Sequence, residues 1–200
     1  DGIQLRILAH YMEDEEFTQA LVSGKKKDGT DVHNLNKRKL TLKHLTRANA
    51  KTFIYAWLLG AGTGKVASIL HTSLKIARSS VASFIDGYPG LKKLKEEQIP
   101  RDVRQRHFKG LDGRLVNCES DHLMLAGYLQ NGESVIMKMA LIIWYFKLKD
   151  MQVPFVLVNF VHDEWAVEVD KEYADVVKQT MSDSIREVGE ILKLNCPLQG

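Results

Sequence analysis

The sequence predicts a mixed α/β (α+β) fold, in which a body with antiparallel strands is interrupted by one inserted helical segment. Three observations lead to this prediction. Two strand-like apolar runs flank a His-Asp-Glu turn within VPFVLVNFVHDEWAVEVD, at residues 153–170. A mostly apolar run at 120–149 has the length of a helix. Helical patterns also fill a strongly basic stretch between residues 25 and 106.

Composition limits the class of protein. The chain has 200 residues, of which 44% are hydrophobic and 26% charged, as in ordinary globular domains, so disorder, collagen and coiled coil are excluded. No run of about 18 apolar residues is present, and we expect no membrane span. The chain begins DGIQLR without Met or a signal pattern and ends abruptly at CPLQG, so we expect a fragment or processed piece. Cys118 and Cys196 do not form a disulfide framework and are expected to be buried free thiols of a cytosolic protein.

Charge is distributed unevenly along the chain. From Lys25 to Lys109 there are 19 basic and 6 acidic residues, whereas the rest of the chain holds 9 basic and 19 acidic ones. A basic block within an acidic frame favours a polyanion-binding module beside a body that carries carboxylates. A solvated basic surface explains the charge equally well.

The first half of the chain is predicted to be mainly helical. At 2–22, GIQLRILAHYM mixes β-branched residues with helical spacing, and we expect a strand followed by a short helix. Residues 23–31 form a Gly- and Lys-rich loop, and 32–45 a short helix with a connection. Thr46 suits a helix N-cap, and the helix that it begins should run to about Leu59, where a Gly-rich segment ends it.

The second half returns to the body. Helical patterns continue at 66–86 and 91–106, and short strands are expected on either side of a turn at 110–113. The long helix and the two strands described above follow. An amphipathic helix at 171–193 ends the pattern, with Val177, Ile185 and other apolar residues along one face.

Arg47, Lys51 and Tyr55 form the first candidate site. Their i, i+4, i+8 spacing places all three on one helix face, with Arg47 and Lys51 about 6 Å apart along the axis. This separation suits two neighbouring phosphates, because Arg grips phosphate oxygens bidentately and Lys is a compact charge and a proton donor. From spacing alone, a solvated helix face with a half-buried Tyr is the simpler explanation.

His162, Asp163 and Glu164 form the second candidate site. Two adjacent carboxylates in a rigid turn suit a hard divalent cation such as magnesium, and the apolar residues around them favour burial. A plain hairpin turn is the alternative, since Asp is common in turns.

Two further features are ambiguous or misleading. The segment from Gly60 to Lys65, GAGTGK, resembles a phosphate-binding loop, but it has three residues instead of four before its Gly-Lys pair, and Val66 follows. We expect it to end a helix rather than begin one. Gln130 is polar within an apolar helix, and it could bind a base edge, make a core hydrogen bond or face solvent.

Taken together, four segments resemble conserved motifs of family A DNA polymerases, especially those of bacteriophages. GIQLRILAH resembles the end of motif A, RANAKTFIYAWLLGAG resembles motif B, HLMLAGYLQ resembles a segment that contacts primer-template DNA, and VHDE resembles motif C. They occur in the family's order and cover nearly the whole chain. The resemblance implies an antiparallel-sheet palm at 1–24 and 107–200, with an inserted helical fingers subdomain at 25–106.

For nucleotide binding, the resemblance implies that Arg47 and Lys51 bind the incoming dNTP, and that Lys51 also donates a proton to the leaving pyrophosphate. Tyr55 would stack near the sugar and base, and His33 would contact the phosphates. Gln4 would occupy a position beside the sugar.

For catalysis, the resemblance implies that Asp163 binds a pair of Mg²⁺ ions, with Glu164 as an accessory catalytic carboxylate. His162 and Gln130 would contact the primer-template DNA. The expected activity is template-directed DNA synthesis in phage replication, in the cytoplasm of a bacterial host. The resemblance does not identify a processivity factor.

Three departures from the family pattern stand out. The first metal-binding Asp of motif A is expected two positions before Asp1, so the residues present should be inactive alone. Gln4 replaces a Glu that packs under the sugar and excludes ribonucleotides, and Leu59 replaces a Tyr that bonds to that Glu. We expect these two changes to compensate each other and to retune sugar selection. Ala126 replaces an Asn that contacts the minor groove.

Two other functions remain open at this stage. A non-catalytic DNA-binding module would use the basic segment alone, and its affinity would depend on salt but not on magnesium or nucleotide. An ATPase that uses the Gly-rich segment would lose hydrolysis when Lys65 is replaced by Ala.

Overall fold

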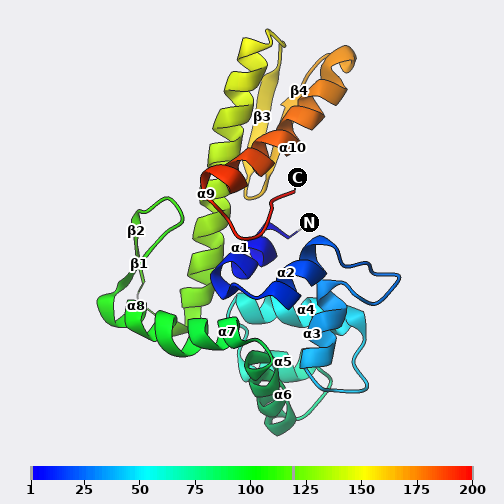
Figure 1. Cartoon of the computed structure of the whole chain (residues 1–200), viewed down its shortest axis with the longest axis vertical. Helices are drawn as coiled ribbons and strands as arrows, with labels where there is room; N and C mark the ends of the chain where they lie inside the picture. The colour runs from blue at the N-terminus through cyan, green and yellow to red at the C-terminus, as the bar shows by residue number, and fades with distance from the viewer. Residues whose placement is uncertain (1, 119, 200) are drawn as a thin grey trace.

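The computed structural model describes residues 2–118 and 120–199. The helix α9 runs the length of the molecule, with the strands β3 and β4 and the helix α10 beside its C-terminal end (Figure 1). The other helices gather around its N-terminal half (Figure 1). In chain order the elements are α1 (Ile3–Met12), α2 (Glu15–Val22), α3 (Val32–Lys39), α4 (Arg47–Leu58), α5 (Thr63–Ile69), α6 (Leu74–Asp86), α7 (Pro89–Lys93), the π-helical turn η1 (Leu94–Gln98), α8 (Ile99–Gln105), β1 (His107–Lys109), β2 (Leu115–Asn117), α9 (Asp121–Asp150), β3 (Val156–Val161), β4 (Glu164–Glu168), the 3₁₀ turn η2 (Lys171–Tyr173) and α10 (Ala174–Ile191).

The mixed α/β fold class is confirmed, although the strands are few. Among the described residues, β1 pairs with β2 and β3 pairs with β4, each as a separate two-stranded antiparallel sheet. The helices expected near 32–45, at 46–59, at 120–149 and at 171–193 are all present. The strands expected beside the turn at 110–113 and around the His-Asp-Glu turn are present too.

The strand expected at the start of the chain is wrong. Residues 3–22 form two helices, α1 and α2, with Glu13 in a left-handed conformation between them. Leu5, Leu8 and Met12 recur at intervals of three and four and are buried, so the helical spacing outweighs the two β-branched residues in this segment.

The basic segment folds as helices α3 to α8, with no strand among its described residues. Its core is aromatic: the Phe84 ring lies 5.2 Å from the ring of Phe53 and 5.2 Å from that of Tyr88, both edge to face. The helix expected at 66–86 is interrupted, because His71 is left-handed and Ser73 caps a new helix by accepting a hydrogen bond from the Ile76 N–H.

The other half of the core lies between α9, α10 and the β3–β4 hairpin. Trp144 of α9 is fully buried, with its ring 4.9 Å from Phe155 and 6.0 Å from Trp165. Cys118 and Cys196 are buried free thiols, as expected. No helix in the described part of the chain is long and apolar enough to cross a membrane.

The crossing of α1 and α9 is close and brings the two motifs on these helices together. A Cβ added at Gly132 would lie 3.1 Å from side-chain atoms of Ile7 and Leu111. Because only a hydrogen occupies this point, α1 can approach the middle of α9 closely at Ile7. Gln4 and Glu133, one on each helix, are consequently neighbours.

Candidate active site

The helix α4 presents the first candidate site, and its start is fixed locally. The Thr46 side chain accepts a hydrogen bond from the Asn49 N–H, and the Asn49 side chain accepts one from the Thr46 N–H, which forms a capping box. Phe53, Ile54 and Leu58 are buried on one side of the helix. Lys51 is exposed, while Arg47 and Tyr55 are half-buried.

Asp31 holds Arg47 in place. The Arg47 Nε donates to both carboxylate oxygens of Asp31, at 3.0 and 3.1 Å. Since only Nε is used, the terminal NH₂ groups of Arg47 make no hydrogen bond within the described residues. Asp31 also caps α3, accepting hydrogen bonds from the His33 N–H and from the Asn34 amide. One carboxylate therefore fixes α3 and the Arg47 side chain together.

This environment shifts the pKa of two groups. Burial alone raises the pKa of Asp31, but hydrogen bonds from Arg47, Asn34 and the His33 N–H, together with the Arg47 charge, lower it to about 2. Burial and the nearby charges of Arg47 and Lys51 lower the pKa of His33 to about 4, against an opposing effect of Asp31. His33 is therefore neutral at pH 7, and its ring lies 6.1 Å from that of Tyr55.

The β3–β4 hairpin presents the second candidate site. Val161 pairs with Glu164, so His162 and Asp163 form the turn, with His162 in a left-handed conformation. Trp165 is buried, but His162, Asp163 and Glu164 are exposed. The expected burial of the turn is therefore wrong, because Trp165 is buried and Phe160 is half-buried against the core while the turn itself projects beyond it.

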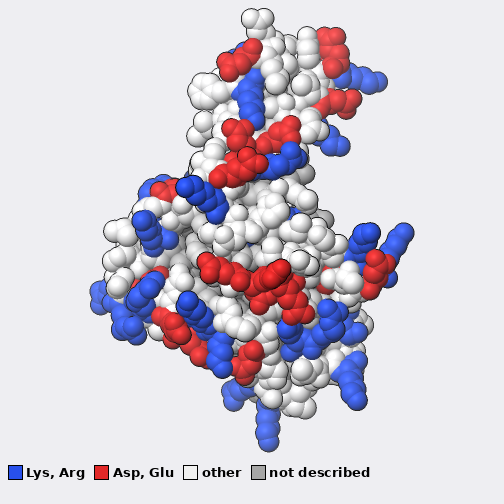
Figure 2. Space-filling model, in the orientation of Figure 1, with Lys and Arg blue, Asp and Glu red and all other residues white. Residues whose placement is uncertain are grey.

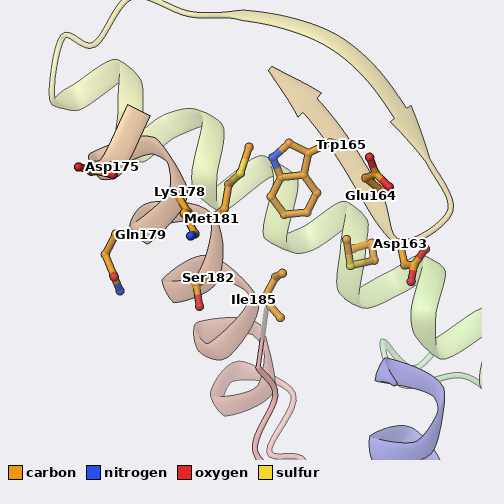
Figure 3. Close-up of a pocket in the computed structure, with 10 residues that line it drawn as sticks. Asp163, Glu164, Trp165, Asp175, Lys178, Gln179, Met181, Ser182 and Ile185 are labelled. Carbon is orange, nitrogen blue, oxygen red and sulfur yellow. The ribbon is translucent and has the colours of Figure 1, made fainter. Parts of the chain in front are cut away.

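Asp163 lies between two clefts. The first, with a volume of about 640 Å³, lies between α1, α9, β3 with the turn that follows it, and the residue after α4; it is lined by Gln4, Leu59, Gln130, Glu133, Ser134, Lys138, Phe160, His162 and Asp163. The second, of about 600 Å³, lies between the hairpin and α10. Figure 3 shows the Asp163 carboxylate at the end of the hairpin nearest α1, with the Glu164 carboxylate pointing in another direction. Of these two clefts, Asp163 lines both, whereas Glu164 lines the second and not the first.

The structure thus brings together some of the predicted residues and leaves others apart. Gln4, Gln130, His162 and Asp163 share the first cleft. Arg47, Lys51, Tyr55 and His33 form a separate cluster on α3 and α4 and are not among the described residues that line this cleft. The two groups meet near the start of α1, where a Cβ added at Gly2 would lie 3.3 Å from the Tyr55 hydroxyl.

The Gly-rich segment does not form a phosphate-binding loop, but one reason given for this in the sequence analysis is wrong. Gly62 is the N-cap of α5, so the segment begins a helix as well as following one. It still lacks the preceding strand that a phosphate-binding loop requires, since α4 precedes it.

Surface charge follows the uneven distribution along the sequence. On the face drawn in Figure 2, Lys and Arg side chains are spread over the lower part of the molecule, where α3 to α8 lie. Asp and Glu side chains form a band across the middle of the same face. The helical segment therefore carries the positive potential that attracts polyanions.

Comparison with known proteins assigns the chain to a family. The model of the family described as DNA polymerase family A matches residues 1–200. This chain belongs to DNA polymerase family A. It is 30% identical to the DNA-directed DNA polymerase of Escherichia phage T7 and 29% identical to that of Enterobacteria phage T3, in each case over 98% of this chain and 30% of the relative. It is 26% identical to DNA polymerase I of Caldicellulosiruptor bescii, over 98% of this chain and 24% of that protein.

The fold agrees with this family. The POL domain of Pol1 from M. smegmatis, in a complex with DNA primer-template and dNTP, matches with a TM-score of 0.82 and 19% identity, over 100% of this chain and 37% of that one. The chain spans about a third or less of the length of the curated phage T7 and T3 relatives that it matches.

Two residues of the site were missed in the sequence analysis. Asp31 precedes the predicted helix at 32–45, and the spacing Asp-x-x-Asn is a local signal for a helix N-cap. No local signal predicts the bond of Asp31 to Arg47, which lies sixteen residues later. Glu133 lies 129 residues from Gln4, whose Nε2 donates to the Glu133 carboxylate at 2.9 Å. A Glu three residues after Gln130 on the same helix was the available signal.

We expect Asp31→Asn to destabilise the protein by about 2 kcal/mol at pH 7, since the carboxylate holding Arg47 has a pKa of about 2 against 3.8 in an unfolded chain. A carboxyl group whose pKa is lower in the folded protein than in the unfolded chain stabilises the fold at every pH above its unfolded pKa. For Asp31 this stabilisation is lost as the pH falls from about 4 to about 2. Urea unfolding of the wild-type protein and of Asp31→Asn between pH 7 and pH 2 should show that the difference between their free energies of unfolding decreases as the pH falls. A difference that stays constant with pH would contradict this account.

Proposed function

We propose that this chain is part of a phage-type replicative DNA polymerase that adds dNTPs to a primer 3′-hydroxyl under the direction of a template. In this proposal residues 1–24 and 107–200 belong to the palm and 25–106 to the fingers. Primer-template DNA and dNTPs are the partners. The relatives that carry the name DNA-directed DNA polymerase support this activity.

One observation supports the proposal most strongly. A single cleft gathers Gln4, Gln130, His162 and Asp163 from three segments far apart in the sequence, and Leu59 extends it to the end of α4. These are the segments that resemble the polymerase motifs. A binding module that used only the basic helices would have no need of a cleft ending on a carboxylate.

The residues on α3 and α4 would bind the triphosphate. Arg47 is held through its Nε, so its terminal NH₂ groups remain available for bidentate contact with phosphate oxygens. Lys51 is exposed one turn further along α4 and would donate a proton to the leaving pyrophosphate. Neutral His33 can donate to a phosphate, and Tyr55 offers its ring to the sugar and base.

The residues present fit part of a magnesium site. Asp163 is exposed and makes no ion pair or hydrogen bond with any other described residue, so its oxygens are available. No group of three or more potential ligands lies together in the described part of the chain. Mg²⁺ usually takes one or two carboxylates and completes its shell with water and substrate phosphates, so Asp163 would hold it, with Glu164 nearby. When bound, a metal pair lowers the pKa of the primer hydroxyl and neutralises charge on the phosphates.

The remaining residues would position the DNA. Gln130 is exposed on α9 and has an amide that can donate to base-edge acceptors in the minor groove. His162 is exposed at the hairpin turn beside Asp163, where the primer end must lie for its hydroxyl to reach the metal. Closure of the α3–α4 cluster towards this cleft would bring the two halves of the site together.

Primer extension by the full-length protein tests the proposal. A labelled primer-template with Mg²⁺ and dNTPs should be extended only by the nucleotide that the template specifies, and omission of Mg²⁺ should abolish extension. Template-independent addition, or DNA binding without extension under these conditions, would reject the proposal. Binding that depends only on salt would instead support a DNA-binding module.

A further inference from the structure

The hydrogen bond between Gln4 and Glu133 is a polar contact in the wall of the Asp163 cleft. The Gln4 Nε2 donates to a Glu133 carboxylate oxygen at 2.9 Å, and both side chains are half-buried. Both residues line the cleft that also contains Asp163. A charged acceptor makes this bond stronger than one between neutral groups.

The helices make the bond well defined. Gln4 lies in the first turn of α1, and Glu133 follows Gly132, the point at which α9 meets Ile7 of α1. Because these helices are packed against each other, Glu133 is a fixed anchor. An unanchored Gln side chain would retain several rotatable bonds and could swing away from the cleft.

If the chain has the proposed function, the sugar of a bound nucleotide must lie near Gln4 and Glu133. The reacting phosphate must lie beside Asp163, and the other phosphates extend towards Lys51 and Arg47. The sugar is bonded directly to the reacting phosphate, so it must lie in or at the edge of the same cleft. Leu59, which follows α4, and Gln4, in the first turn of α1, both line this cleft and form part of its wall on the side of these two helices.

We propose that Glu133 is a positioning residue for sugar selection: by holding the Gln4 amide, it keeps the Gln4 side chain against the 2′ position of the nucleotide. A 2′-hydrogen can pack against this wall. A 2′-hydroxyl requires space that the anchored side chain occupies, so a ribonucleotide binds less well when its phosphate is placed for reaction.

The pair also explains why residue 4 is an amide. A carboxylate at this position would lie about 3 Å from the Glu133 carboxylate, and two like charges at that distance repel each other. The amide removes the repulsion and supplies the donor that Glu133 requires. The direct contact with Glu133 is therefore sufficient to explain the amide at residue 4. The replacement of a Tyr by Leu59 does not by itself require an amide there, because the Leu59 side chain has no polar group that needs a hydrogen-bond partner.

Competition between a dNTP and the matching ribonucleotide tests the proposal in the full-length protein. The measurement is the ratio of the two kcat/KM values for single-nucleotide primer extension in Mg²⁺. We expect Glu133→Ala and Gln4→Ala each to lower the preference for the dNTP by about 10-fold, and the double variant to lower it no further, because both remove one contact. Glu133→Gln keeps an acceptor oxygen and should preserve most of the preference.

An exchange of the two side chains provides a rescue that a general loss of stability cannot imitate. Gln4→Glu alone should lower the preference, whereas Gln4→Glu with Glu133→Gln restores a hydrogen bond of reversed polarity and should recover it. Asp183→Ala is the matched control, because Asp183 accepts from the Gln179 amide at 3.0 Å on the exposed surface of α10. It should leave the ratio unchanged.

The outcomes separate this inference from the proposed function. A wild-type protein that extends primers but whose ratio is unaffected by Glu133→Ala overturns the role of Glu133 while leaving polymerase activity in place. Failure of the exchange variant to recover the preference overturns it as well. A wild-type protein that does not extend primers rejects the proposed function, and this inference with it.

Discussion

Asp163→Asn is expected to reduce primer extension by about 10³-fold or more, because it removes a negative charge that would hold the catalytic metal while preserving the shape of the side chain. Asp163 is exposed at the hairpin turn and bonds to no other described residue, so the fold does not depend on it. The loss should therefore appear in kcat, with an unfolding midpoint in urea that stays the same. Rapid-quench measurement of single-nucleotide addition gives the rate of the chemical step directly.

Glu164→Gln is the matched control for this prediction. It makes the same change one residue along the chain, but Glu164 lines the cleft beside α10 and points in another direction (Figure 3). We expect a clearly smaller loss than for Asp163. Equal losses in the two variants would mean that the hairpin carries both carboxylates into one site, contrary to the arrangement described above. Primer-template binding without Mg²⁺ should persist in Asp163→Asn.

Local signals in the sequence were sufficient for most of the helices. Thr46 caps α4 through its own side chain, and the two apolar runs on either side of the His-Asp-Glu turn correspond to β3 and β4. The first segment failed because a short apolar run satisfies both strand and helix patterns. Packing of Leu5 and Leu8 into the core decides in favour of the helix.

The site was predictable only where its residues belong to one element. The spacing of Arg47, Lys51 and Tyr55 predicts that they share one face of a helix, and the position of Asp163 in a turn between two apolar runs predicts a carboxylate at the end of a hairpin, whereas the roles assigned to these residues come from the family resemblance. Asp31 and Glu133 act through contacts between elements, across 16 and 129 residues, and no local pattern contains such a distance. The exposure of the turn was also unpredictable, because whether only the strand residues Phe160 and Trp165 or the turn as well reach the core depends on where α9 and α10 pack.

Lys51→Ala is expected to slow nucleotide addition by about 10²- to 10³-fold, because it removes both a charge for the phosphates and the proposed proton donor to pyrophosphate. Lys51 is exposed on α4, and the buried residues Phe53 and Ile54 hold the helix without it, so the fold should be unaffected. Lys51→Arg separates the two roles. Arg keeps the positive charge but does not release its proton at neutral pH. Compared with Lys51→Ala, the Lys51→Arg variant should therefore restore the KM for the nucleotide more fully than kcat.

Lys65→Ala is the control that distinguishes this mechanism from the alternative based on the Gly-rich segment. Lys65 is also an exposed lysine of the basic region, but it lies on α5, beyond the cleft and the Arg47 cluster. If the phosphates bind along α4, this variant should extend primers within about twofold of the wild-type rate, as expected for a surface substitution. A severe loss for Lys65→Ala with a mild one for Lys51→Ala would move the phosphate site to the segment at residues 60–65. Because both substitutions remove one positive charge from the same helical segment, a general weakening of DNA binding would lower both activities equally, and only a specific phosphate contact can separate them.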